Sequence, residues 1–218
     1  MPLGTAILGW GSLIWEGGAF DKWHEDWRCD GPTLNLEFSR VSESRLKALT
    51  LVIDSDNGVP IQVAWCLSRR DDPNGARDDL RSREGTTVRN IGRVLLAQPD
   101  SELADESAST ITVWGRTQAL DSVVWTGLSS NFELATGRPF SVDSALAHLR
   151  SLPTSAKAKA AEYLLKAPVF IKTPLRTAVQ NEKWFLEQVH KSVLEARERN
   201  RRPHRINISV FVSISNGI

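Results

Sequence analysis

The sequence contains little of what marks the most easily recognised classes of protein. Only two of its 218 residues are cysteines, and Cys29 and Cys66 form no CxxC pair. This excludes a disulfide scaffold and favours a reducing, cytoplasmic location. The 27 Lys and Arg residues nearly balance the 26 Asp and Glu residues, so no general attraction to nucleic acid or to a membrane is expected. Met1–Trp15 lacks the basic residues of a secretory signal, and no apolar run is long enough to cross a bilayer.

The common motifs for metals and nucleophiles are also missing. The four histidines are scattered and form no HExxH sequence, so a metal site is not expected. No GxSxG sequence is present. Cys66 falls inside an expected strand and is interpreted as a small core residue. Cys29 has no neighbouring histidine arrangement and is interpreted as unreactive.

Tryptophan is the residue that the chain has in excess, with eight Trp against a single Tyr. Five of the eight precede residue 70: Trp10, Trp15, Trp23, Trp27 and Trp65. Such a concentration of indole rings usually indicates a bulky core and less often an apolar pocket. With 41% hydrophobic and 24% charged residues, the chain has the composition of a folded globular protein. Its length suits one domain, or one domain with an appended segment.

Short apolar runs bounded by turn residues predict β-strands in the first half of the chain. Leu34–Val41 alternates apolar and polar residues, which is typical of a strand with one buried face. Ala48–Ile53 and Ile61–Leu67 flank the turn sequence Asp54–Gly58, so they are expected to form a β-hairpin. Gln98–Ser109 is acidic and serine-rich and is expected to be a surface loop. Further strands are expected over Leu3–Leu8, Gly92–Ala97, Thr110–Arg116, Ser122–Thr126 and, near the C-terminus, Ile206–Ile214.

Helical periodicity appears after the strands and dominates the last third of the chain. Asp72 and Pro73 suit the cap and first turn of a helix that Gly85 would end. Ser141 is the expected cap of a second helix. Amphipathic patterns then predict helices over Ser155–Lys166 and, after a linker from Pro168, over Pro174–Asn200.

The turn after the first strand is the best local candidate for a binding site. Trp10-Gly11-Ser12-Leu13 follows the strand closely, and such glycine-containing turns can point backbone N–H groups at a carboxylate or a carbonyl. No lysine follows the glycines, and Ile14 occupies the third glycine position of a GxGxxG motif. The ordinary alternative, a tight turn without a ligand, is favoured by the spacing alone.

Glu84 is the second candidate. A glutamate at the C-terminal end of a helix is placed unfavourably in the helix dipole, and function sometimes explains such a choice. The ordinary alternative is a solvated Glu84 paired with Arg81, which is favoured without further information.

Three segments together resemble a known family. The first, Ile7–Trp15, looks like the YGSL motif at the start of the ChaC-like branch of the gamma-glutamylcyclotransferases, with Trp10 in the place of the tyrosine. Phe38–Asp54 resembles the second strand block of that family. Val63–Glu84 resembles the strand–helix element that ends in an Arg-Glu pair. The three motifs occur in the family's order and do not extend beyond Asp100.

The resemblance implies an α+β fold, a small mixed β-barrel with surrounding helices, over residues 1–138. Residues 139–218 would be a helical C-terminal extension packed on that barrel. The family cleaves γ-glutamyl amides by attack of the α-amino group on the γ-carbonyl, which releases 5-oxoproline and uses no metal and no cofactor. By this resemblance Glu84 would be the catalytic acid and base. Trp10, Gly11, Ser12 and Leu13, with Arg45 or its neighbour Arg40, would bind the substrate.

Two readings of function stay open at this point. One is an enzyme acting on a small γ-glutamyl compound, and the other is a non-catalytic binding or interaction module on the same fold. The basic run from Arg197 to Arg205 could contact nucleic acid, but a solvated helix end is the favoured interpretation, so a nucleic-acid partner is not expected. No feature of the sequence indicates an oligomeric state or a membrane partner.

Overall fold

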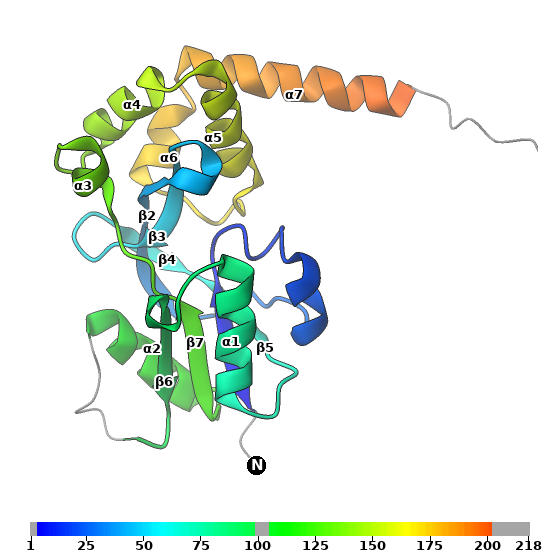
Figure 1. The fold of residues 1–218 in the computed structure, drawn as a ribbon, viewed down its shortest axis with the longest axis vertical. Helices are drawn as coiled ribbons and strands as arrows, with labels where there is room; N and C mark the ends of the chain where they lie inside the picture. Colours follow the sequence, from blue (N-terminus) through cyan, green and yellow to red (C-terminus); the bar gives the residue numbers. More distant parts are fainter. Residues whose placement is uncertain (1–3, 99–104, 202–218) are drawn as a thin grey trace, which may run out of the picture.

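The protein has a mixed α+β fold in which two small sheets are surrounded by helices (Figure 1). The structure, a computed structural model, describes residues 4–98 and 105–201. The expected α+β class is confirmed. Within the described ranges the strands are hydrogen-bonded as two sheets, one of four strands and one of three.

The four-stranded sheet has the order β5-β1-β7-β6. β1 pairs with β7 in parallel, and the other neighbours are antiparallel. Helix α1 covers one face, where Ile7 and Val124 pack, and helix α2 covers the face on which Ala6 and Val123 lie. Because both faces are covered, the central strands consist almost wholly of buried residues. The elements are β1 (Thr5–Gly9), β5 (Ala64–Leu67), β6 (Ile91–Leu95), β7 (Ser122–Thr126), α1 (Pro73–Glu84) and α2 (Glu106–Thr117).

The three-stranded sheet has the order β3-β2-β4 and corrects the predicted hairpin. Its strands are β2 (Thr33–Ser42), β3 (Ala48–Ile53) and β4 (Val59–Gln62). The Asp54–Gly58 turn is present, but β3 and β4 pair with opposite edges of β2 and not with each other. A Cβ at Gly58 would lie 2.6 Å from the carbonyl carbon of Asn35, so glycine allows the turn to cross close over β2. Beyond β4, the chain continues through Val63 into β5, which joins the two sheets.

The expected strand over Thr110–Arg116 is wrong, because this segment lies in helix α2. Asp105 caps the helix by accepting a hydrogen bond from the backbone N–H of Ala108 at 2.8 Å. The helix includes the last residues of the expected loop Gln98–Ser109. The β-branched residues suggested a strand, but the buried positions Ala108, Ile111, Thr112 and Gly115 follow the helical period. Packing on the sheet therefore outweighs the local propensity.

The predicted half-buried character of β2 is also wrong. Glu37 and Ser39, on its polar face, are fully buried. The Glu37 carboxylate accepts hydrogen bonds from the backbone N–H groups of Phe38, at 2.7 Å, and Leu175, at 3.3 Å. Leu175 belongs to helix α6 (Pro174–Val179), which covers this face of the sheet. Burial raises the pKa of Glu37, and the hydrogen bonds, including one with the Thr173 side chain, only partly offset this effect.

Between β7 and Arg201 the structure contains five helices, and they share one hydrophobic core with the three-stranded sheet. They are α3 (Phe132–Thr136), α4 (Val142–Ser151), α5 (Thr154–Lys166), α6 (Pro174–Val179) and α7 (Lys183–Arg201). Ser141 caps α4 as predicted. The single helix expected over Pro174–Asn200 is instead α6 and α7, separated at Gln180–Glu182, and Figure 1 shows α7 projecting from the others. The expected strand Ile206–Ile214 lies outside the described residues, and the division at residue 138 stays a prediction.

Glu37→Gln isolates the titration of the buried carboxyl. Since the folded state holds the proton of Glu37 more tightly than the unfolded state, Glu37 lowers the stability of the wild type as pH rises above about 4.5, the group's ordinary pKa. We therefore expect the free energy of unfolding of the wild type, minus that of Glu37→Gln, to fall between acidic and neutral pH. Denaturant titrations of both proteins over this range measure the difference. A difference that rises with pH would contradict the assigned direction.

Candidate active site

The main cavity of the described structure has a volume of about 650 Å³. Five parts of the chain line it: the segment after β1, strands β2 and β3 with their connection, the C-terminal end of α1, the end of β7 with Leu128, and Tyr163 from α5 (Thr154–Lys166). A smaller cavity of about 50 Å³ shares several lining residues with the main one, among them Ser12, Glu84 and Tyr163. The two cavities therefore adjoin, and together they make up the candidate site.

Helix α1 carries Glu84 to this site at its last residue. The helix begins and ends as predicted: Asp72 accepts hydrogen bonds from the backbone N–H groups of Asn74 and Gly75, and Gly85 adopts a left-handed φ of 60°. Ala76 and Leu80 are fully buried against the four-stranded sheet. This packing fixes the position of the helix end at the cavity.

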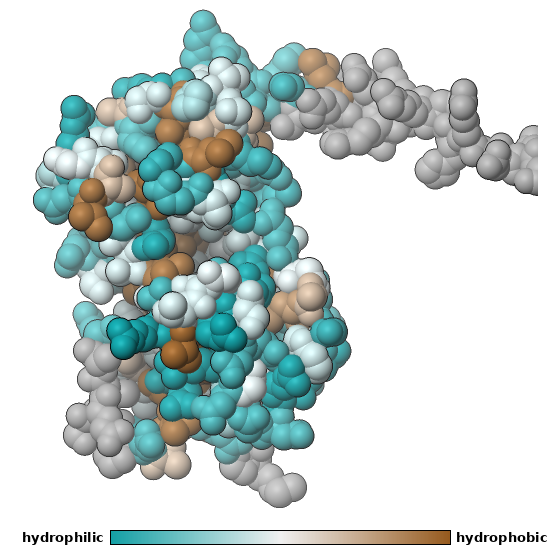
Figure 2. Space-filling view, viewed as in Figure 1, coloured by the Kyte–Doolittle hydropathy of each residue, from teal (hydrophilic) through white to brown (hydrophobic). Residues whose placement is uncertain are grey.

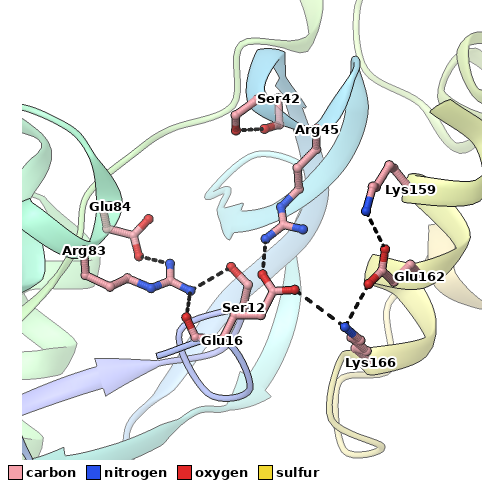
Figure 3. A network of polar contacts seen from close by, with 10 residues as sticks. Ser12, Glu16, Ser42, Arg45, Arg83, Glu84, Lys159, Glu162 and Lys166 are labelled. Carbon is pink, nitrogen blue, oxygen red and sulfur yellow. Dashed lines mark hydrogen bonds and ion pairs between the residues drawn. The ribbon is translucent and has the colours of Figure 1, made fainter. Parts of the chain in front are cut away.

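Glu84 is bound by Arg83 and not by Arg81. Arg83 Nη1 donates to Glu84 Oε1 at 2.7 Å, whereas Arg81 pairs with Asp78 (Figure 3). The Glu84 side chain is only 16% exposed, so the solvated alternative is wrong. Its second oxygen, Oε2, receives no hydrogen bond from the residues that the structure describes. One carboxylate oxygen is thus held and the other is left for a ligand.

The turn after β1 lies beside Glu84 and is bound by the same arginine. Arg83 Nη2 donates to Ser12 Oγ at 3.2 Å and to the backbone carbonyl of Glu16 at 3.1 Å (Figure 3). The carbonyl of Ser12 accepts from the backbone N–H groups of Trp15 and Glu16, at 3.2 and 2.7 Å, which curls the segment back on itself. The turn and the helix end are therefore held together by a single guanidinium group.

The structure brings the predicted site residues together at this place. Trp10, Ser12, Arg45 and Glu84 line the main cavity, while Gly11 and Leu13 line the smaller one. The Leu13 side chain packs with the core under α1, so its part of the cavity lining is limited. Proximity supports a common role for these residues without assigning one.

Glu16 connects the turn to Arg45 and to α5. Arg45 Nη2 donates to Glu16 Oε2 at 2.6 Å, and Lys166 lies 3.7 Å from Glu16 Oε1. Burial raises the pKa of Glu16, but the hydrogen bond and charge of Arg45, together with Lys166, outweigh burial and hold the pKa below its ordinary value. Lys166 also pairs with Glu162 at 2.8 Å, which continues the network along α5 (Figure 3).

Tyr163 is the site residue that sequence reasoning missed. It lies in the helix that was expected over Ser155–Lys166, and it is buried, with its ring 5.3 Å from Trp15 in an edge contact. The Arg45 guanidinium lies 4.9 Å from the ring centroid. A Cβ at Gly11 would lie 2.6 Å from the Tyr163 hydroxyl, so glycine is needed there for the close approach. The one available signal was that Tyr163 is the chain's only tyrosine.

Burial raises the pKa of Tyr163 to about 12. Backbone hydrogen bonds from Leu51 and Ser12 and the charge of Arg45 lower this pKa, whereas the charge of Glu84 raises it. The hydroxyl therefore keeps its proton throughout the ordinary pH range.

Arg40 differs from the other two arginines of the cavity. Arg45 and Arg83 each pair with a carboxylate, whereas Arg40 Nη1 donates to the carbonyl of Ser129 at 2.8 Å and pairs with no carboxylate of the described residues. Burial lowers the pKa of Arg40, yet a guanidinium stays charged at ordinary pH. A partly buried cation without a counter-ion favours an anionic group in the cavity.

The comparisons with known proteins assign no family to this chain. The sequence matches no family model, and neither the curated proteins nor the solved structures gave a match. Over residues 4–98 and 105–201, no helix combines the length and the apolar character needed to cross a membrane. Those same ranges contain no cluster of three or more His, Cys, Asp or Glu side chains arranged to bind a metal ion.

The single tyrosine gives a direct optical test of this geometry. Because the negative charge of Glu84 raises the pKa of Tyr163, Glu84→Gln should lower the midpoint of the phenolate titration; because the positive charge of Arg45 lowers it, Arg45→Gln should raise the midpoint. The increase in phenolate absorbance with pH measures both shifts while circular dichroism confirms the native fold. Asp78→Asn, on the solvent side of α1, is the control and should leave the midpoint unchanged. A shift of the opposite sign in either variant would contradict the assigned neighbours.

Proposed function

We propose that this protein is a gamma-glutamylcyclotransferase-like enzyme that cleaves a γ-glutamyl amide and releases 5-oxoproline. One observation carries the proposal: Glu84 and the Trp10–Leu13 turn, about seventy residues apart in the sequence, line the same two adjoining cavities, and no residue of the described ranges donates to Glu84 Oε2. This is the pair of groups that the family's chemistry requires.

The charges around the cavity suit a zwitterionic substrate. Three arginines and three carboxylates line it: Arg40, Arg45, Arg83, Glu16, Asp79 and Glu84. A γ-glutamyl group carries one α-ammonium and one α-carboxylate, whereas a phosphate or a nucleic acid carries only negative charge. In the proposal, Arg40 binds the α-carboxylate, because among the cavity arginines it alone has no ion pair with a described residue, and Glu84 faces the α-ammonium group.

The reaction is an intramolecular acyl transfer. Glu84 removes a proton from the α-ammonium group, and the freed amine attacks the γ-carbonyl carbon to form the ring C–N bond. Negative charge then develops on the carbonyl oxygen before the bond to the leaving nitrogen breaks. The substrate nitrogen gives up two protons on becoming the ring N–H, and the leaving nitrogen gains two on becoming an ammonium ion. Protons therefore balance, and one carboxylate can carry them in turn.

We also propose that the fold is of the β-barrel type that the family resemblance implies. The strands form two separate sheets, which the chain joins directly from β4 through Val63 into β5; in the proposal these sheets correspond to the family's barrel. Trp10, which is buried and lines both cavities, fills the place of the family's tyrosine with a larger ring and no hydroxyl. Because the larger ring would narrow the pocket, a substrate panel should contain small γ-glutamyl amines as well as γ-glutamyl peptides.

Glu84→Gln tests the chemistry with little change in shape. Glutamine keeps the size of the side chain but cannot accept a proton, so we expect release of 5-oxoproline to fall by about 10²–10⁴-fold. Turnover of a panel of γ-glutamyl amines and γ-glutamyl peptides, followed by detection of 5-oxoproline, provides the measurement. Asp78→Asn on the same helix is the matched control and should retain full activity.

Two results would count against the proposal in different ways. Equal turnover by wild type and Glu84→Gln would remove Glu84 from the mechanism. Binding of panel members by the wild type without any turnover would instead favour the non-catalytic binding module.

Arg40→Gln tests the proposed contact with the α-carboxylate. A charge-assisted hydrogen bond to a carboxylate is lost, so we expect a higher KM for any substrate that the wild type cleaves, by about ten-fold or more. Arg138→Gln, at an exposed position outside the cavity, serves as the control. An unchanged KM in steady-state assays of Arg40→Gln would show that the α-carboxylate is bound elsewhere.

A further inference from the structure

The hydroxyl of Tyr163 is a hydrogen-bond donor without a protein acceptor. A phenol O–H can both donate and accept hydrogen bonds. The backbone of Leu51 and of Ser12 lies close enough to this oxygen to lower the pKa of the phenol. No acceptor for the hydroxyl proton is found among the residues that the structure describes. The proton is thus left for a group that enters the cavity.

The position of the hydroxyl makes this free donor significant. Tyr163 lines both cavities, and its oxygen would lie 2.6 Å from a Cβ at Gly11, so it is placed directly against the Trp10–Leu13 turn. Glu84 is close enough for its charge to affect the phenol. The Tyr163 hydroxyl and the Glu84 carboxylate therefore line the same part of the cavity.

The rest of the molecule holds the ring firmly in place. Trp15 and Phe38 make edge contacts with it, at centroid distances of 5.3 and 6.1 Å. Helix α5, which carries Tyr163, is tied to the turn through Lys166 and Glu16. A donor that is already fixed before the reaction needs little reorganisation when charge appears.

We propose that Tyr163 is a catalytic residue that donates a hydrogen bond to the γ-carbonyl oxygen of the substrate as this oxygen becomes negatively charged. This inference rests on the proposed function. It adds one donor to those expected from the sequence, because the Tyr163 hydroxyl lies directly against the turn at Gly11. The raised pKa of Tyr163 agrees with this role, since a donor must keep its proton at the working pH.

Tyr163→Phe removes the donor and keeps the ring. Loss of one donor to a developing oxyanion typically lowers kcat by about 10²–10³-fold, and we expect a loss in that range with little change in KM. The assay uses the γ-glutamyl substrate that the wild type cleaves fastest. Trp15→Phe is the packing control: it loosens the contact with the Tyr163 ring but leaves the hydroxyl, so it should retain most of kcat.

Binding and thermal unfolding separate a catalytic role from a structural one. If Tyr163 acts on the developing oxyanion, Tyr163→Phe should bind 5-oxoproline, measured by calorimetry, with nearly wild-type affinity and should keep a nearly wild-type Tm. A joint loss of kcat, product affinity and Tm would make Tyr163 a structural residue and overturn the inference.

The remaining outcomes distinguish this inference from the function on which it rests. An active wild type with an equally active Tyr163→Phe variant would overturn the role of Tyr163 and leave the cyclotransferase proposal intact. A wild type that releases no 5-oxoproline from any panel member would overturn the proposed function, and the inference with it.

Discussion

The contact on which the site depends is the one made by the Arg83 guanidinium. It binds the carboxylate of Glu84 with one nitrogen, and with the other it binds Ser12 Oγ and the backbone carbonyl of Glu16. The planar guanidinium has enough donors in fixed directions to hold the two segments at once, which a lysine ammonium could not do with the same geometry. Both side chains of the ion pair are mostly buried, at 12% and 16% exposure, so water competes little with these hydrogen bonds.

The sequence predicted those parts of the fold in which local signals and packing agree. The cap at Asp72, the left-handed stop at Gly85 and the buried face of α1 all point to the same helix, and the structure contains it. In α2 the signals disagree, because β-branched residues favour a strand whereas Ala108, Ile111 and Gly115 follow a helical period. There the period was the better guide, since burial on the sheet decides the outcome.

Pairing between distant segments could not be predicted in the same way. The turn at Asp54–Gly58 is a strong local signal, and an adjacent hairpin is the simplest interpretation of it. Whether β3 and β4 bind each other or opposite edges of β2 depends on β2, which the turn itself does not encode. Tyr163 was missed for a related reason: a helix pattern shows that a residue is buried, but it does not show that its hydroxyl meets the backbone of Ser12.

The part that α5 plays in the cavity has a consequence for the order in which the site is made. The Trp10–Leu13 turn and Glu84 are synthesised first, and Tyr163 and Lys166 follow about eighty residues after Glu84. A nascent chain that has been translated as far as Ser141 contains the turn and Glu84 but not the Tyr163 ring that lies against Gly11. Completion of the cavity is therefore coupled to synthesis of α5.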